Sequence, residues 1–241
     1  MIDKKFLQNY AIKEGTSLDN VLREYTQHLF LRNFYTKPDS QNFLFKGGTA
    51  LKLAFGSPRF SEDLDFTGIK NSTHYEEILQ DCLLMLSTEG IKVELVESKP
   101  TSGGHLAIIK AGLLGEEVEI QNQISFRPRG NVAGENVVIN SGIAPAYNIH
   151  ILDRKILIAE KIEALIERAK PRDFFDLYFI FRDQKLRRHL QFDEGQREKV
   201  LGNLEKQRKE ELARELKRLL PRSFWPVVKD LPAALKREMG V

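Results

Sequence analysis

Residues 46–66 of the chain read KGGTALKLAFGSPRFSEDLDF. The glycine pair follows a short apolar run, residues 43–45, and precedes apolar residues at helical spacing. Two aspartates, Asp63 and Asp65, stand near the end, separated by one leucine. Side chains at positions i and i+2 of a β-strand point to the same face. A strand here would therefore present both carboxylates together, with the residues between and after them facing the core.

Two carboxylates held this close repel each other unless a cation lies between them. Mg²⁺, or Mn²⁺ in its place, commonly binds through one or two carboxylates together with substrate phosphates. Gly47 and Gly48 would add backbone N–H groups and a helix N-terminus, which suit a triphosphate. Thr49 can cap that helix or reach a phosphate, and Ser61 would share the strand face of the aspartates. Either feature alone is common in turns and solvated strand edges, and only their combination predicts a site.

Two separate signatures point to a known family. Gly47-Gly48-Thr49 followed by Ser61-x-Asp63-x-Asp65 resembles the first motif of the DNA polymerase β-type nucleotidyltransferase superfamily. More narrowly, FKGGTAL at 45–51 with RFSEDLDF at 59–66 is similar to the AbiEii/AbiGii toxin family, the toxin halves of abortive-infection toxin–antitoxin pairs. The second signature of that family is a helical lysine followed by Arg-Asp-x-x-Asp-Leu. It is matched by AEK at 159–161 and RDFFDL at 172–177.

The resemblance implies a fold, a reaction and a set of site residues. The fold is α/β (α+β), a nucleotidyltransferase-type mixed sheet with flanking helices plus a C-terminal helical domain. The reaction transfers a nucleoside monophosphate from an NTP to an acceptor, for this family the 3′ end of tRNA, and a cognate antitoxin is the expected partner. We predict the following residues for catalysis: Ser61, Asp63, Asp65, Lys161 and Asp176. We predict the following for nucleotide binding: Lys46, Gly47, Gly48, Thr49, Ser61, Lys161, Arg172 and Asp173.

The second signature also has an ordinary structural interpretation. Lys161 lies in an apolar helical pattern, where a lysine is usually solvated, but a compact ammonium can also offset the charge of triphosphate oxygens. Arg172 and Asp176 are helical i, i+4 neighbours, so they could form a structural ion pair. In the active site, Asp176 would orient a ligand or act as a base toward the acceptor hydroxyl. Asp173 could instead orient a neighbouring group. The sequence leaves open which of the two acids reaches the site.

A third carboxylate is expected on a later strand in polymerase β-type enzymes. Residues 117–126 alternate between polar and apolar side chains, as a half-buried strand does. Glu119, with Glu117 on the same face, is the best-placed candidate for a third ligand of the metal held by Asp63 and Asp65. The alternative is an ordinary solvent-facing acid on a hairpin.

Helical and strand patterns divide the chain near residue 150. Strands are expected at 43–46, 62–67, 91–97, 105–113 and 117–126. Helices are expected at 17–34, 49–55, 74–89, 172–182 and 204–220, and between Asp153 and the Lys170-Pro171 break. Ser17 and Asp153 are the expected N-caps, and Gly90 is the expected C′ residue of helix 74–89. Residues 127–150 are rich in glycine and proline and indicate a long irregular or hairpin connection. We therefore predict a catalytic domain at 1–150 and a helical domain at 151–241 that completes the active site.

Composition limits the classes of protein further. The chain has 241 residues, 41% of them apolar, and one cysteine, Cys82, in an apolar helical pattern. It contains no run of about 18 apolar residues and no secretory leader, so a cytoplasmic protein with no membrane contact is expected. The net charge is +3, but residues 182–241 carry sixteen Lys or Arg against ten Asp or Glu. This basic region suits a polyanionic substrate, although a charged solvated helix gives the same pattern.

Three other functions share parts of this pattern. The same chemistry could act on a small molecule or on a protein hydroxyl. The chain could also be a catalytically silent nucleotide-binding homologue. Glycosyltransferases use Asp-x-Asp with a metal as well, but they lack an upstream glycine pair at this spacing.

Overall fold

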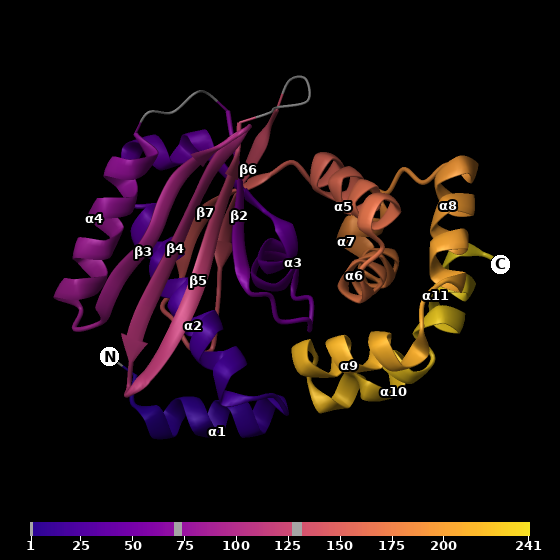
Figure 1. Ribbon diagram of the computed structural model, residues 1–241, viewed down its shortest axis with the longest axis horizontal. Helices are drawn as coiled ribbons and strands as arrows, with labels where there is room; N and C mark the ends of the chain where they lie inside the picture. Colours follow the sequence, from indigo (N-terminus) through magenta and orange to yellow (C-terminus); the bar gives the residue numbers. More distant parts are fainter. Residues whose placement is uncertain (1, 70–73, 127–131) are drawn as a thin grey trace. The chain divides into compact units, whose positions relative to one another are not determined.

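The computed structural model describes residues 2–69, 74–126 and 132–241, in two compact units (Figure 1). The N-terminal unit comprises residues 1–56 and 60–152. The C-terminal unit comprises residues 153–241 together with the short segment Ser57–Arg59. The chain therefore enters the C-terminal unit briefly, returns for the remaining strands of the N-terminal unit, and enters it again after Leu152. None of the described helices is both long enough and apolar enough to span a membrane.

The N-terminal unit contains, within the described residues, one mixed sheet of seven strands in the order β3-β4-β5-β2-β1-β7-β6. The strands are β1 (Phe43–Lys46), β2 (Asp63–Gly68), β3 (Lys92–Thr101), β4 (Gly104–Leu113), β5 (Glu116–Ser125), β6 (Gly134–Ile139) and β7 (Tyr147–Leu152). At its centre, β2 runs antiparallel to β1 and parallel to β5, and β1 runs parallel to β7. The strand that carries the two aspartates is therefore an interior strand of the sheet.

Helices α2 and α4 pack on the apolar face of this sheet. The helices of the unit are α1 (Lys4–Glu14), α2 (Leu18–Phe34), α3 (Gly47–Phe55) and α4 (Tyr75–Thr88). Phe34 of α2 lies 5.1 Å from Phe66 of β2, and Tyr75 of α4 lies 5.8 Å from Phe43 of β1, measured between ring centroids. In Figure 1, α4 and α3 lie on opposite sides of the sheet. Because side chains alternate along β2, Asp63 and Asp65 lie on the face away from Phe66.

Capping residues and glycines end the helices near the site as the sequence predicts, except at the start of α3. The Ser17 hydroxyl accepts a hydrogen bond from the Asn20 N–H at 3.2 Å, so the predicted cap of α2 is confirmed. Gly90 follows α4 with a φ of +84°, as expected for a left-handed C′ residue. Helix α3 begins at Gly47 rather than Thr49. The glycine pair is thus the first turn of the helix and not a loop before it.

Residues 127–150 were predicted as an irregular or hairpin connection, and the hairpin is the form that the structure shows. β6 pairs antiparallel with β7, which begins within the segment at Tyr147; residues 127–131 lie outside the described residues. Alternating burial at 147–152 is the strand signal that the nearby glycines and prolines obscured. The predicted helix 204–220 is divided between two helices, because the polar residues 206–208 interrupt it. Helix α1, capped by Asp3, was not anticipated.

The C-terminal unit is helical throughout its described elements. These are α5 (Arg154–Arg168), α6 (Pro171–Arg182), α7 (Gln184–Arg187), α8 (Glu194–Glu205), α9 (Lys209–Leu219), η2 (Arg222–Phe224), α10 (Trp225–Lys229) and α11 (Leu231–Met239). The Asp153 carboxylate accepts the N–H of Lys155 at 2.9 Å and that of Ile156 at 3.4 Å, which confirms the predicted cap of α5. The predicted mixed α/β fold with a helical C-terminal region is confirmed.

Candidate functional site

The glycine turn at the start of α3 packs directly against one of the two aspartates. Lys46, the last residue of β1, pairs with Asp65 of β2. Gly47 follows with a φ of +82°, a conformation that L side chains rarely adopt. A Cβ atom on Gly47 would lie 2.1 Å from Asp65 Oδ2. Glycine is therefore required here both for the backbone conformation and for the close approach of the carboxylate.

The two aspartates lie on one face of β2, as their spacing predicts, and both are half-buried. In the neighbouring strand β5, Gln121 pairs with Asp63 and Gln123 pairs with Asp65. Paired residues of adjacent strands share a face of the sheet. The carboxylates thus have two carboxamides beside them on one side and the first turn of α3 on the other.

Glu119 is not opposite either aspartate. It lies two residues before Gln121 on the same face of β5, it is exposed, and it pairs with Lys110 of β4. The position beside Asp63, where a third carboxylate would be most useful, is occupied by Gln121. The role of Glu119 as a metal ligand stays a prediction.

Thr49 does not cap α3 as the sequence allowed, and Ser61 lies before the strand whose face it was expected to share. Thr49 is fully buried, and its hydroxyl donates a hydrogen bond to the backbone carbonyl of Asp63 instead of capping α3. Ser61 precedes β2, so the alternation of that strand does not place its side chain. The Ser61 carbonyl accepts a hydrogen bond at 3.0 Å from the carboxamide of Gln27, a residue of α2.

The donor set of this face suits a hard divalent cation that also binds substrate phosphates. Within residues 2–69, 74–126 and 132–241, no three His, Cys, Asp or Glu side chains come together as a metal site. Mg²⁺ does not require such a cage, since it binds through one or two carboxylates and completes its shell with water and phosphate oxygens. Asp63 and Asp65 supply that pair. The contact of Gly47 with Asp65 holds one of them at the start of α3.

A buried ion cluster in the C-terminal unit contains the other two predicted catalytic residues. Asp176 of α6 is 1% exposed. Its carboxylate accepts hydrogen bonds from Arg59 Nε at 2.7 Å and Nη2 at 2.9 Å, and from Lys161 Nζ of α5 at 2.8 Å. Arg59 and Lys161 are themselves buried. The cluster thus joins α5, α6 and the Ser57–Arg59 segment through one carboxylate and two cations.

The charges in this cluster decide the protonation state of Asp176. Burial by itself raises the pKa of the Asp176 carboxyl group, but the charges and hydrogen bonds of Arg59 and Lys161 outweigh it. The pKa falls from its ordinary value of 3.8 to about 2. For Arg59, burial by itself lowers the pKa, and the Asp176 charge outweighs it and raises the pKa. Asp176 is therefore ionised at any physiological pH.

The ion pair expected between Arg172 and Asp176 is not formed among the described residues, because Arg59 and Lys161 occupy the carboxylate. Asp173 binds a different partner: its oxygens accept hydrogen bonds from Arg168 Nη2 at 2.7 Å and Nε at 2.9 Å. Asp173 also accepts the Lys170 N–H at 3.1 Å and so caps α6. Of the two acids left open by the sequence, Asp176 is the one that binds Lys161.

The sequence interpretation missed Gln27 and Arg59. Arg59 lies in the first family motif, but nothing in that motif indicates that it pairs with Asp176, 117 residues away. For Gln27, the sequence of α2 contains a weak indication of a structural role. Asn20, Glu24, Gln27 and His28 recur at helical spacing on α2, and all four are buried. A buried polar stripe of this kind indicates a helix that packs against backbone groups as well as against a core.

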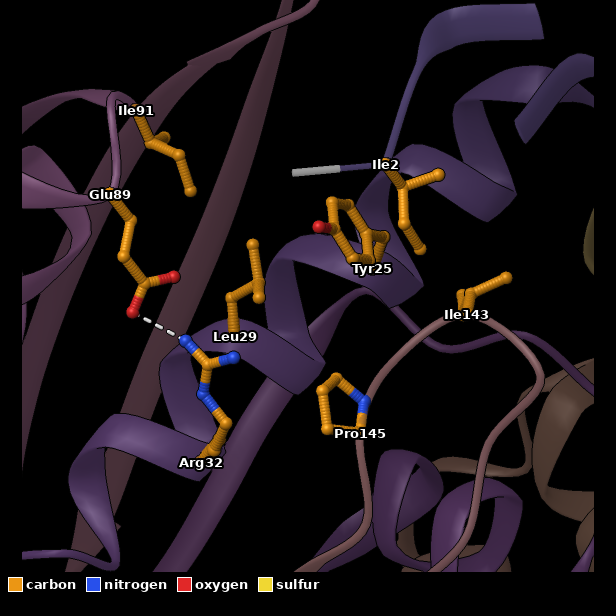
Figure 2. A pocket seen from close by; sticks show the side chains of 8 residues that line it. All are labelled: Ile2, Tyr25, Leu29, Arg32, Glu89, Ile91, Ile143 and Pro145. Carbon is orange, nitrogen blue, oxygen red and sulfur yellow. Dashed lines mark hydrogen bonds and ion pairs between the residues drawn. The ribbon is translucent and has the colours of Figure 1, made fainter. Parts of the chain in front are cut away.

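A separate pocket lies in the N-terminal unit, beside α2 (Figure 2). Its volume is about 490 Å³, and it is lined by apolar side chains such as Tyr25, Leu29 and Ile91, with the Arg32–Glu89 ion pair at one side. None of the residues that line this pocket is a predicted site residue. It is therefore distinct from the face that carries the two aspartates.

Solved structures share this fold. MenT4, a nucleotidyltransferase toxin from Mycobacterium tuberculosis H37Rv, aligns with 100% of this chain and 93% of its own, with a TM-score of 0.62 and 17% identity. JHP933 from Helicobacter pylori aligns with 93% of this chain and 94% of its own, with a TM-score of 0.59 and 21% identity. At such low identity these likenesses concern the fold alone. A search of curated proteins gives no match.

The sequence identifies the family itself. The profile of the family described as "Nucleotidyl transferase AbiEii toxin, Type IV TA system" matches residues 29–235, most of the chain. The match includes both signatures and the whole of α3, β2, α5 and α6. The chain belongs to this family of nucleotidyltransferase toxins from type IV toxin–antitoxin systems.

Replacing Gly47 by alanine should separate steric contact from backbone strain. Gly115 has nearly the same φ, +83°, but a Cβ atom there would meet nothing within 4 Å. Gly115→Ala should therefore lower the free energy of unfolding by only about 1–2 kcal/mol, the cost of a left-handed L residue. Gly47→Ala should cost clearly more, because the Asp65 carboxylate must also move. Urea unfolding of both variants measures this, and equal losses would refute the close contact.

The Asp176 cluster predicts a pH dependence of stability. A carboxyl group whose pKa is lowered on folding stabilises the protein above its unfolded pKa and loses that effect as pH falls through the folded pKa. The free-energy difference between wild type and Asp176→Asn should be constant above about pH 4 and shrink by about 2 kcal/mol toward pH 2. Above pH 4 the variant should be less stable by about 3–5 kcal/mol, because two buried cations lose their counter-ion.

Unfolding curves at several pH values test this expectation. The matched control is Glu116→Gln, which removes an exposed ion pair with Lys4 and should change stability by less than about 1 kcal/mol at every pH. If the difference in unfolding free energy between wild type and Asp176→Asn did not depend on pH, Asp176 would not be held ionised by its neighbours.

Proposed function

We propose that this protein transfers a nucleoside monophosphate from an NTP to the 3′ end of a tRNA, and that this modification makes it a toxin. The acceptor hydroxyl oxygen forms a bond to the α-phosphorus, and the bond from that phosphorus to the β-phosphate oxygen breaks, which releases pyrophosphate. The observation that carries the proposal is the pair Asp63 and Asp65 on one strand face, with Gly47 packed against the second carboxylate.

The residues of the N-terminal unit would position the NTP. The N–H groups of the first turn of α3, at Gly47–Thr49, lack helical partners and are suited to phosphate oxygens. Lys46, adjacent to this turn, would add positive charge, and Ser61 would contact a phosphate. Asp63 and Asp65 would hold Mg²⁺, which supplies charge neutralisation for the triphosphate when bound.

The residues of the C-terminal unit are proposed on chemical grounds and on the family resemblance. The Lys161 ammonium, held by Asp176 at 2.8 Å, is a compact positive charge of the kind that suits phosphate oxygens. We assign that role to Lys161. A carboxylate with a pKa of about 2 is a poor proton acceptor. Asp176 is therefore proposed to orient Lys161, and not to act as the general base.

The proposed acceptor rests on charge and on the family. Residues 182–241 carry an excess of six positive charges, whereas the rest of the chain carries an excess of three negative charges. A basic region favours a polyanion such as RNA over a small neutral acceptor. Membership of a type IV toxin–antitoxin family supports an antitoxin partner and a cytoplasmic site of action.

The test is incubation of the protein with Mg²⁺, each α-³²P-labelled NTP in turn, and total RNA. We expect label in tRNA-sized bands with at least one NTP. Asp63→Asn should lower the rate by about 100-fold or more, because the charge that organises the reacting phosphates is lost. Glu62→Gln is the matched control, an acid-to-amide change at the adjacent, half-buried position, and it should retain activity.

The outcomes distinguish the alternatives. Label in a protein or in a small molecule, with none in RNA, would replace tRNA by another acceptor. No labelled product with any NTP, together with measurable NTP binding, would identify a silent homologue and overturn the proposal. Labelling that survives in Asp63→Asn would refute the assignment of the two aspartates.

A further inference from the structure

Gln27 makes an unusual pair of contacts just before the aspartates. It lies on α2, 34 residues before Ser61, and is 1% exposed. Its carboxamide nitrogen lies 3.0 Å from the Ser61 carbonyl oxygen and 3.2 Å from that of Glu62. A carboxamide nitrogen carries two hydrogens, so one side chain satisfies two successive backbone acceptors.

These two contacts define the shape of the chain in front of β2. Successive carbonyls of an extended strand point in opposite directions. The carbonyls of Ser61 and Glu62 instead converge on one nitrogen atom, and β2 begins only after them, at Asp63. The two hydrogen bonds therefore hold the backbone that carries the Ser61 side chain, whose direction relative to Asp63 strand alternation alone does not determine.

Neighbouring residues hold the two ends of the same segment, Phe60 and Asp63. The buried Thr49 hydroxyl binds the next carbonyl, that of Asp63. On the other side, the Lys52 ammonium lies 3.8 Å from the centroid of the Phe60 ring and 3.4 Å from Glu24 of α2. Each residue from Phe60 to Asp63 is therefore held by a side chain of α2 or α3.

We propose that Gln27 is a positioning residue for the transfer reaction, which holds the backbone at Ser61–Glu62 and thereby aligns Ser61 with Asp63. This inference rests on the proposed function. Gln27 is buried behind the segment and acts through Ser61 and Asp63, without touching substrate. Misplacement of reacting groups by about 1 Å can lower a rate by about 100-fold. Loss of both donors should therefore lower kcat more than it weakens NTP binding.

The test compares Gln27→Met with Thr26→Val. Gln27→Met keeps the length of the side chain and removes both donors. Thr26, the adjacent residue, is equally buried, and its hydroxyl binds only within α2, to the Leu22 carbonyl at 2.8 Å. Both variants thus lose buried hydrogen bonds from the same helix. Circular dichroism and thermal unfolding report whether each is folded under the assay conditions.

We expect kcat of Gln27→Met to fall by about 10- to 100-fold, with KM for the NTP within about twofold of wild type. Thr26→Val should keep both constants within about twofold. Hydrogen exchange of peptides covering residues 60–65 should be faster in Gln27→Met alone. Equal activity of Gln27→Met and Thr26→Val would overturn the inference. It would also be overturned if the activity of Gln27→Met fell only in proportion to its fraction of folded protein.

The failure of the proposed function is distinguishable from that of this inference. If the wild-type protein labels no acceptor with any NTP, the proposed function falls, and hydrogen exchange then decides whether Gln27 holds the Ser61–Glu62 backbone. Faster exchange confined to residues 60–65 would show that it does, which is the structural part of the inference. Unchanged exchange there would refute it, whatever the activity.

Discussion

A fully buried carboxylate is the constraint on which much of the C-terminal unit depends. An ionised Asp176 that is 1% exposed would be strongly unfavourable without partners, because burial removes its hydration. Arg59 supplies two parallel hydrogen bonds and Lys161 a third. These contacts fix the relative register of α5 and α6 and hold the Ser57–Arg59 segment to both. The short Lys170-Pro171 connection, closed by the Asp173 cap, leaves the two helices little freedom to change that register.

In the N-terminal unit, contacts to the backbone hold the residues around the two aspartates in place. Gly47 brings the start of α3 against Asp65, and side chains of α2 and α3 hold the backbone from Phe60 to Asp63. Reacting groups built on a strand and supported by buried hydrogen bonds are more precisely placed than groups on a loop. The polar residues inside α2 are consistent with this arrangement, since an apolar stripe at Gln27 would leave two carbonyls without donors.

The sequence predicted what local patterns determine. The i, i+2 spacing of Asp63 and Asp65 places them on one face, and the caps at Ser17 and Asp153 follow from residue type and position. Family signatures predicted the mixed sheet and the helical C-terminal region. Contacts between distant segments were not predictable in this way. The partner of Asp176 is 117 residues away in sequence, so the helical i, i+4 rule pointed to Arg172 instead of Arg59.

Contacts between distant segments also determine which residues lie beside Asp63 and Asp65, and the sequence did not predict these residues either. The position beside Asp63 is set by the register of β2 with β5, which pairs it with Gln121. Alternation along β5 places Glu119 and Gln121 on the same face but does not determine which of them faces the aspartate. Gln27 lay outside every motif, because its partners are backbone carbonyls and these carry no sequence signature.

The path of the chain through the two units limits how this protein can be divided or recombined. Neither unit is one continuous segment, since Ser57–Arg59 belongs with residues 153–241. A fragment that begins at Asp153 would contain Asp176 and Lys161 but would lack the guanidinium of Arg59. A fragment that ends at Leu152 would contain Arg59 without the carboxylate of Asp176. Exchange of halves between distant relatives by a single crossover would therefore break the ion cluster, which favours inheritance of both halves together.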